Sequence, residues 1–205
     1  TFKIPTRKMS SEHEVFFSSL ACKFENRFKK ILEIGTFDGN NSFLLSRIFK
    51  NSEIDTIDLD SNSDEFRYSY DRIDQVKEFS NNRNSILKKN KNIKFIQCNS
   101  LELTLKNVLK MQDLIWVDGD HVYPTAAIDI TNSIKLLNKN GILMCDDIWK
   151  ERERLFSTYD SIAGYETLNA FSKINFINNI FFQKRICKEY NRDKKYIGFS
   201  KKLEI

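Results

Sequence analysis

One pattern repeats five times between residues 30 and 146 and limits the folds open to this chain: a short apolar run, a polar turn and a helical segment. The apolar runs, expected as strands, are residues 30–34, 53–58, 93–98, 113–118 and 141–146. Two more strands, 174–186 and 194–202, are expected to follow a helical segment near 151–172. Strands that alternate with helices are typical of a parallel sheet buried on both faces. The pattern predicts an α/β, Rossmann-like doubly wound sheet, mostly parallel, with a C-terminal antiparallel β-hairpin and helices on both faces.

Before the first strand we expect an arm over residues 1–9 and then an amphipathic helix. Ser11 and Glu14 have the spacing of a capping box, which marks a helix start. Apolar residues then recur at helical intervals, namely Phe17, Leu20, Phe24 and Phe28. We expect residues 1–29 to form the N-terminal arm and helix, and residues 30–205 to form a single domain. The helix could cover the sheet or pair with a second copy of the chain, so a homo-oligomer stays open.

The composition is that of an ordinary globular protein and argues against several other classes. Of 205 residues, 40% are hydrophobic and 30% are charged. The four cysteines lie far apart, which argues against a zinc cluster or a disulfide framework. No stretch reaches the about 20 apolar residues of a membrane span, and there is no signal-peptide pattern, so we expect a cytoplasmic protein without a membrane partner. The net charge of +5 is mild and favours an anionic small molecule over nucleic acid.

Ligands of doubly wound sheets bind outside the carboxyl ends of the strands, so the residues there form the candidate site. The first strand ends in a turn between Gly35 and Gly39, where the backbone can come close to a ligand. The turn matches neither the dinucleotide fingerprint nor a phosphate loop. Glu33 would repel a pyrophosphate and attract a cationic amino group. The alternative is a tight strand-to-helix turn that binds nothing.

The second and third strand ends carry polar residues suited to a nucleoside. Asp58 closes the second strand about twenty residues after the glycine turn, as an acid that binds ribose hydroxyls would. Asp60 is its competitor, and a solvated carboxylate is the alternative. Asn99 and Ser100 follow the third strand and could contact an adenine edge or form a helix N-cap.

Three carboxylates follow the fourth and fifth strands. Asp118 closes the fourth, and Asp146 and Asp147 close the fifth. Neighbouring strands lie about 5 Å apart, so these side chains can converge on Mg²⁺, which prefers hard oxygen ligands. Without a cation the cluster would take up a proton; alternatively, one or two of the acids cap helices or face solvent. His121, three residues after Asp118, would be mostly neutral near pH 7 and able to act as a general base.

These motifs carry a family resemblance over residues 31–149, through "LEIGTFDGNNS", "TIDLD", "CNS", "WVDGDH" and "CDD". The stretch resembles class I S-adenosylmethionine-dependent methyltransferases. Within that superfamily it is similar to metal-dependent O-methyltransferases, namely catechol O-methyltransferase and, in its "DGDHxY" turn, the macrocin and mycinamicin sugar O-methyltransferases. The resemblance makes residues 30–205 one S-adenosylmethionine-binding domain.

The resemblance also implies roles at matching positions. Glu33, Gly35 and Gly39 would hold the methionine part of the cofactor, with Asn41 at the start of the helix, and Asp58 would grip the ribose. The full set of implied cofactor contacts is Glu33, Gly35, Phe37, Gly39, Asn41, Asp58, Asn99, Ser100 and Asp118. Phe37 replaces the middle glycine of the commonest turn, as an aromatic residue does in the catechol type. The implied metal ligands are Asp118, Asp146 and Asp147, and the implied base is His121.

The expected reaction is methyl transfer to a hydroxyl of a small molecule or sugar, with Mg²⁺ holding the acceptor oxygen, which favours a vicinal diol or catechol. The rivals are an RNA- or protein-directed methyltransferase, or a protein that binds the cofactor or RNA without chemistry. The Asn/Asp-Pro-Pro-aromatic motif of amino-group methylation is absent, and Cys145 fits poorly as a nucleophile.

Tyr123 and Trp149 could stack on an acceptor or serve packing. Segment 61–90 is interpreted as a solvated helix, or alternatively as an acceptor-specific lid. The basic run that could bind RNA is interpreted as a solvated helix end and consists of Lys88, Lys89, Lys91 and Lys94.

Overall fold

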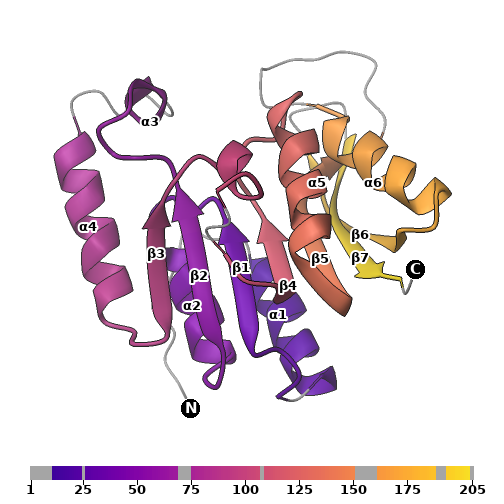
Figure 1. Cartoon of the computed structure of the whole chain (residues 1–205), viewed down its shortest axis with the longest axis horizontal. Coiled ribbons are helices and arrows are strands. Elements are labelled where there is room, and N and C mark those ends of the chain that lie inside the picture. Colours follow the sequence, from indigo (N-terminus) through magenta and orange to yellow (C-terminus); the bar gives the residue numbers. More distant parts are fainter. Residues whose placement is uncertain are drawn as a thin grey trace.

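The fold is a seven-stranded mixed sheet with helices on both faces (Figure 1). It is seen in a computed structural model that describes residues 11–24, 26–68, 75–106, 109–150, 161–187 and 193–203. The strand order is β3-β2-β1-β4-β5-β7-β6. The first five strands are parallel, while β7 runs antiparallel to both β5 and β6. The strands are β1 (Lys30–Ile34), β2 (Glu53–Asp58), β3 (Ile93–Gln97), β4 (Gln112–Val117), β5 (Leu137–Trp149), β6 (Ile177–Cys187) and β7 (Asp193–Lys202).

The predicted doubly wound sheet with a terminal hairpin is confirmed, and β1 and β2 have the bounds read from the sequence. The helices are α1 (Ser11–Lys23), α2 (Asn40–Ile48), α3 (Asp64–Tyr68), α4 (Val76–Lys88), the 3₁₀-helix η2 (Ser100–Glu102), α5 (Thr125–Leu136) and α6 (Ala163–Lys173). The arm over residues 1–9 and the first part of the helical segment near 151–172 lie outside the described residues.

Two expectations about single elements were wrong. The helical segment expected between the third and fourth strands is reduced to the single turn of η2 in the part of that segment that the structure describes. The fifth strand, expected over 141–146, runs from Leu137 to Trp149 because it pairs with β4 on one side and with β7 on the other. The turn signal Asn140-Gly141 predicts that the strand begins there. Pairing with the neighbouring strands therefore extends it beyond the bounds that the local sequence indicates.

The hydrophobic core has two layers because alternate residues of a strand point to opposite faces of the sheet. On one face, α1 and α2 cover Ile31 and Trp116, which pack with Phe17. On the other face, α5 and α6 cover Leu32 and Ile115. Of the two alternatives for the N-terminal helix, the structure therefore shows α1 covering the sheet.

Segment 61–90 divides into two parts. Helix α4 buries Arg83 and Leu87, and its other residues are exposed or half-buried, as expected of a solvated helix. Helix α3, in contrast, lies over the carboxyl end of the sheet and contributes Glu65 and Phe66 to the wall of a cavity. Within the described ranges, none of the helices has the length and apolar character needed to cross a bilayer.

Candidate active site

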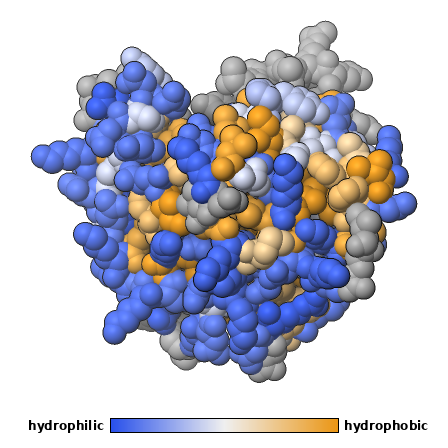
Figure 2. Space-filling model, in the orientation of Figure 1, coloured by the Kyte–Doolittle hydropathy of each residue, from blue (hydrophilic) through white to orange (hydrophobic). Residues whose placement is uncertain are grey.

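A cavity of about 650 Å³ opens above the carboxyl ends of β1 to β4. Figure 2 shows a hollow at this edge of the molecule, between the region of α3 and that of α5. Six of the predicted cofactor-binding residues line the cavity, namely Gly35, Phe37, Asp58, Asn99, Ser100 and Asp118. Its size lies within the usual range for small-molecule and cofactor sites. The position confirms that the switch point of the sheet, between β1 and β4, carries a pocket.

The glycine turn lets two strand ends approach each other. Gly35 has φ +100°, and a Cβ atom built there would lie 2.2 Å from the carbonyl oxygen of Asp118. Only glycine can therefore stand where the backbone after β1 passes the backbone after β4. Gly39 also has a positive φ, of +80°, and precedes α2. Phe37 between them is in the left-handed region, at φ 48°, and its ring contacts that of Phe79.

The carboxylate of Asp58 is held in a defined orientation at the cavity wall. Its Oδ2 accepts a hydrogen bond of 2.8 Å from the backbone N–H of Phe37, and its Oδ1 accepts one of 2.8 Å from Leu59. The buried guanidinium of Arg83 lies 3.9 Å from Oδ2. Its competitor Asp60 does not line the cavity and instead accepts a hydrogen bond from the backbone N–H of Asn62.

Glu33 lies beneath the turn rather than in the cavity wall. Its side chain is fully buried and accepts hydrogen bonds from Asn41 Nδ2 at 2.8 Å, from Thr56 Oγ1 at 2.6 Å and from Ser42. Burial raises the pKa of Glu33 to about 7, although these three donors oppose the rise. Like Glu33, Gly39 and Asn41 are not among the lining residues.

The far end of the cavity carries an acid that sequence reasoning did not single out. Asn99 caps η2, since its Oδ1 accepts a hydrogen bond from Leu101 N–H, so the N-cap interpretation of Asn99 is confirmed. Asp129, on α5, also lines the cavity and is 1% exposed. Burial raises the pKa of Asp129 to about 7, and its Oδ1 has no hydrogen-bond partner. The only available signal was its place on the buried face of the predicted helix.

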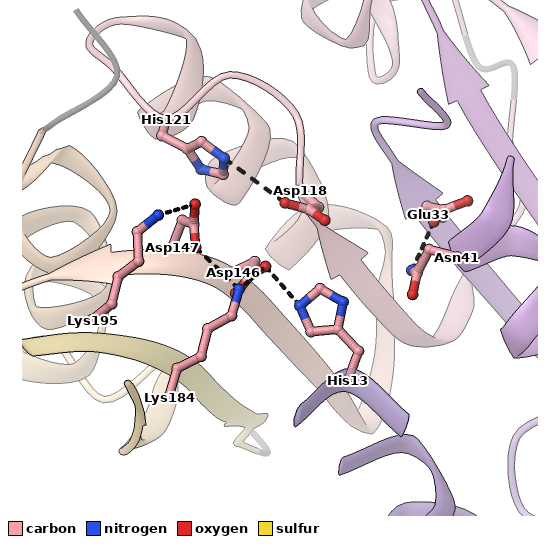
Figure 3. A network of polar contacts seen from close by, with 9 residues as sticks. All are labelled: His13, Glu33, Asn41, Asp118, His121, Asp146, Asp147, Lys184 and Lys195. Atoms are coloured by element: carbon pink, nitrogen blue, oxygen red, sulfur yellow. Dashed lines mark hydrogen bonds and ion pairs between the residues drawn. The ribbon is translucent and has the colours of Figure 1, made fainter. Parts of the chain in front are cut away.

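The acidic cluster of Asp118, Asp146 and Asp147 forms at the ends of β4 and β5, as the sequence predicts, and it contains lysines (Figure 3). Lys184 Nζ lies 2.7 Å from Asp146 Oδ1, 2.6 Å from Asp146 Oδ2 and 3.1 Å from Asp147 Oδ1. Lys195 pairs with the other oxygen of Asp147.

A histidine of the N-terminal helix completes the surroundings of the cluster. His13 Nε2, on α1, lies 2.7 Å from Asp146 Oδ2, and both side chains are buried. The His13 ring also meets that of Trp116 edge-on, which holds it against the sheet. One ligand atom each from His13, Asp118 and Asp146 lie within 4.8 Å of one another.

Asp146 and Asp147 are adjacent in sequence yet both contact Lys184, which a regular strand would not allow. The pairing of β5 with β7 shifts register between Cys145 and Ile148, and Asp147 has φ 53°. A bulge of this kind re-aims a side chain. The pairing of β6 with β7 shifts likewise between Gln183 and Arg185, on either side of Lys184.

The charges of the cluster shift its carboxyl pKa values in opposite directions. Burial raises the pKa of Asp118 well above its usual range, and the charges of Asp146 and Asp147 add to the rise. Burial also disfavours ionised Asp146, but His13 and Lys184 outweigh it and hold the pKa of Asp146 below its usual range. The pKa of Asp147 is likewise lowered, because Lys184 and Lys195 outweigh burial and the charge of Asp146. Of the three carboxyl groups, Asp118 is therefore the one whose pKa shift favours proton uptake.

The predicted metal ligands meet this arrangement only in part. His13, Asp118 and Asp146 offer donor atoms of the kinds that a divalent cation accepts. Asp147 is not in that group and pairs with Lys195 and Lys184 instead. Moreover, both oxygens of Asp146 contact the Lys184 ammonium. With Lys184 in this position, the residues do not fit a bound Mg²⁺.

His121 stands on the turn after β4, beside the acidic cluster. Its Nε2 lies 3.8 Å from Asp118 Oδ1, and its side chain is 17% exposed. Burial lowers the pKa of His121 despite the nearby charges of Asp147 and Asp146. The shift therefore favours the neutral imidazole, which can accept a proton. The other four residues of the stretch 118–122 line the cavity.

Other side chains named from the sequence play no part in the cavity wall. Trp149 is buried, which supports packing, and Tyr123 is half exposed with its hydroxyl 2.9 Å from Glu166. Cys145 is buried and its thiol pKa is raised by burial, which makes it a poor nucleophile. The basic run of Lys88, Lys89, Lys91 and Lys94 is exposed at the amino end of β3, opposite the cavity.

Comparison with known proteins decides the family. The sequence pattern of a family described as a methyltransferase domain matches residues 32–148, from β1 to the end of the acidic cluster. The chain belongs to this family. It is a class I S-adenosylmethionine-dependent methyltransferase, as the sequence motifs predict. No curated protein sequence matches the chain.

Solved methyltransferase structures share the fold at low sequence identity. The O-methyltransferase TomG from Streptomyces achromogenes, in complex with S-adenosylmethionine, is 16% identical with a TM-score of 0.66, over 99% of this chain and 85% of TomG. An O-methyltransferase from Bacillus cereus, in complex with S-adenosylhomocysteine, is 14% identical with a TM-score of 0.61, over 97% and 84% of the two chains. The N-methyltransferase NodS from Bradyrhizobium japonicum is 14% identical with a TM-score of 0.62, over 95% and 98%. The fold therefore does not distinguish oxygen from nitrogen as the acceptor.

Proposed function

We propose that this methyltransferase transfers the methyl group of S-adenosylmethionine to a hydroxyl of a small molecule, with His121 as general base. The observation that carries the proposal is the mostly buried imidazole of His121, 3.8 Å from Asp118, within a stretch that otherwise lines the cavity. Its lowered pKa favours the neutral form, which accepts a proton. A hydroxyl must lose its proton as it is methylated, and a base on the turn that borders the cavity would meet that need.

The cavity has the parts that the cofactor requires. Asp58, oriented by two backbone N–H groups, would accept hydrogen bonds from the ribose hydroxyls. Ser100 and the N-cap Asn99 would lie on the adenine side, and Gly35 would let the backbone approach the methionine part. Glu33, with Asn41, would act from beneath the turn, by holding the start of α2 against β1.

The chemistry asks little of the protein beyond alignment and proton removal. When bound, S-adenosylmethionine supplies a methyl sulfonium, which is already a good electrophile. The acceptor oxygen forms the new C–O bond as the sulfur–methyl bond breaks, and its proton passes to the imidazole of His121. Alignment can contribute up to about 7–11 kcal/mol and general base catalysis about 10²–10⁴-fold. No step is assigned to the predicted Mg²⁺, because Lys184 contacts both oxygens of Asp146.

The acceptor class follows from the base and from the motifs. Two structural neighbours act on oxygen by their names, and the motif of amino-group methylation is absent from the sequence. We propose a small-molecule or sugar hydroxyl, with an anionic group favoured by the net charge of +5. An RNA acceptor is the second candidate, but the exposed basic run lies at the opposite end of the sheet from the cavity.

Calorimetric titration with S-adenosylhomocysteine tests the cofactor site. We expect Asp58→Ala to weaken binding at least about tenfold, because hydrogen bonds to a charged group are worth about 1.5–3 kcal/mol. Asp60→Ala, two residues along and outside the cavity wall, is the matched control and should bind as wild type does. Equal affinity in all three proteins would contradict the assignment of Asp58.

A methyl-transfer assay over a panel of hydroxyl acceptors then tests the reaction. His121→Asn should lower kcat by about 10²–10⁴ while leaving the affinity for S-adenosylhomocysteine unchanged. Transfer to amines in preference to alcohols, or full activity of His121→Asn, would refute the proposed reaction.

A further inference from the structure

Lys184 occupies the place in the acidic cluster that sequence reasoning assigned to a metal ion. Its ammonium nitrogen contacts Asp146 Oδ1, Asp146 Oδ2 and Asp147 Oδ1 at 2.6–3.1 Å. A lysine ammonium has three N–H donors, so these contacts use all of them. The Lys184 side chain is 4% exposed, which leaves it little freedom to move aside.

The contacts make a divalent cation on Asp146 electrostatically unfavourable. Mg²⁺ binds carboxylate oxygens at about 2.0–2.1 Å. Since both oxygens lie within 2.7 Å of Lys184 Nζ, an ion bound to either would stand no more than about 5 Å from a second positive charge. His13 Nε2 is also directed at Asp146 Oδ2, at 2.7 Å. Both carboxylate oxygens of Asp146 are therefore already bound by the protein's own side chains, Lys184 and His13.

The backbone is arranged to produce this contact. The β5 bulge at Asp146 and Asp147 turns two adjacent carboxylates toward one point, and the β6 irregularity beside Lys184 delivers an ammonium to it (Figure 3). Lys195, from the intervening strand β7, neutralises the remaining oxygen of Asp147. The two lysines thus neutralise two of the three carboxylates. The negative charge that remains is too small to require a divalent cation.

We propose that Lys184 is the resident cation of the acidic cluster and that this methyltransferase holds no divalent metal there. Lys184 is a positioning residue: it keeps Asp146 and Asp147 in place beneath His121 and Asp118, in the role that a metal ion would have. The corollary is that removal of the ammonium exposes a latent metal site made of His13, Asp118 and Asp146. The statement about catalysis rests on the proposed function, whereas the statement about metal binding does not.

Titration with MnCl₂, followed by electron paramagnetic resonance, tests the inference without any acceptor. Wild type should bind no Mn²⁺ at the cluster at micromolar concentrations. Lys184→Met should bind one Mn²⁺ per chain at least about tenfold more tightly than wild type, because a repelling charge has been removed. The double variant Lys184→Met/Asp146→Asn should lose that site.

Lys202→Met is the matched control. Lys202 is also a half-buried lysine of the C-terminal hairpin, but its ammonium donates to the carbonyl oxygens of Ile134 and Leu137 and contacts no carboxylate of the described residues. Its substitution should create no Mn²⁺ site. If Lys184→Met does not fold, as judged by S-adenosylhomocysteine binding and circular dichroism, Lys184→Gln replaces it, since the amide keeps a donor without the charge.

Two results would overturn the inference. Tight Mn²⁺ binding by wild type that Asp146→Asn abolishes would show that Lys184 yields to a metal. Absence of a Mn²⁺ site in folded Lys184→Met would show that something other than the ammonium excludes the ion. Failure of the proposed function would instead appear as loss of cofactor binding or of methyl transfer, measured separately.

Discussion

Glu33 and Asp146 are both buried carboxylates near the carboxyl ends of β1 and β5, yet their pKa values are shifted in opposite directions. Glu33 is surrounded by the neutral donors Ser42, Thr56 and Asn41, and burial raises its pKa to about 7. Asp146 is surrounded by Lys184 and His13, which hold its pKa below the usual range in spite of burial. The difference teaches that neutral hydrogen bonds do not offset the loss of water around a buried anion, whereas a contacting ammonium does.

The comparison also separates the two halves of the site. The half proposed for the cofactor, over β1 to β3, is built from the turns that follow these strands and from the side chains that these turns carry. The half proposed for the acceptor is an ion-pair network drawn from α1, the turn after β4, β5, β6 and β7. Three substitutions test this contrast.

The largest effect is expected at Asp146. Asp146→Asn leaves Lys184 buried beside an amide, and breaking a buried ion pair costs about 3–5 kcal/mol. Urea unfolding should show that loss in the free energy of unfolding at pH 7. A loss below about 1 kcal/mol would mean that the network contributes no more than a surface pair does.

Glu33→Gln should have an intermediate effect that depends on pH. Because the pKa of Glu33 is raised from 4.5 to about 7 on folding, its contribution to stability is complete below pH 4.5 and is lost as the pH rises through 7. Relative to Glu33→Gln, wild type should therefore lose about 3 kcal/mol between pH 4.5 and 8, to first order.

Urea unfolding of both proteins across this pH range measures the difference. Asp129, whose pKa is also about 7, is present in both proteins and cancels in the comparison. A difference in stability that does not change with pH would show that Glu33 titrates as an ordinary exposed carboxyl.

The smallest effect is expected at Lys30, which pairs with Glu53 at the surface. The carboxylate of Glu53 is well exposed, so water screens the pair. Lys30→Met should leave the urea midpoint unchanged within error. A clear shift of the midpoint would show that this exposed pair contributes to stability as the buried Lys184 network does.

Local sequence by itself determined the sheet and the half of the site that we propose for the cofactor. Apolar runs bounded by turn residues are enough to define β1 and β2, and the doubly wound topology then brings Gly35, Asp58 and Asp118 to one cavity. These features depend on short-range sequence patterns and on the general topology of doubly wound sheets, and neither depends on contacts between distant residues.

Only the tertiary structure decided what neutralises the acidic cluster. His13 is 133 residues from Asp146 and Lys184 is 38 residues from it, and nothing in the local pattern of either residue indicates a partner. Lys184 is one lysine in a charged hairpin until β7 pairs between β5 and β6 and two bulges bring its ammonium to the carboxylates. The charge of a buried site is a sum over long-range contacts, so three acids in the sequence suggested a metal where the fold supplies an ammonium.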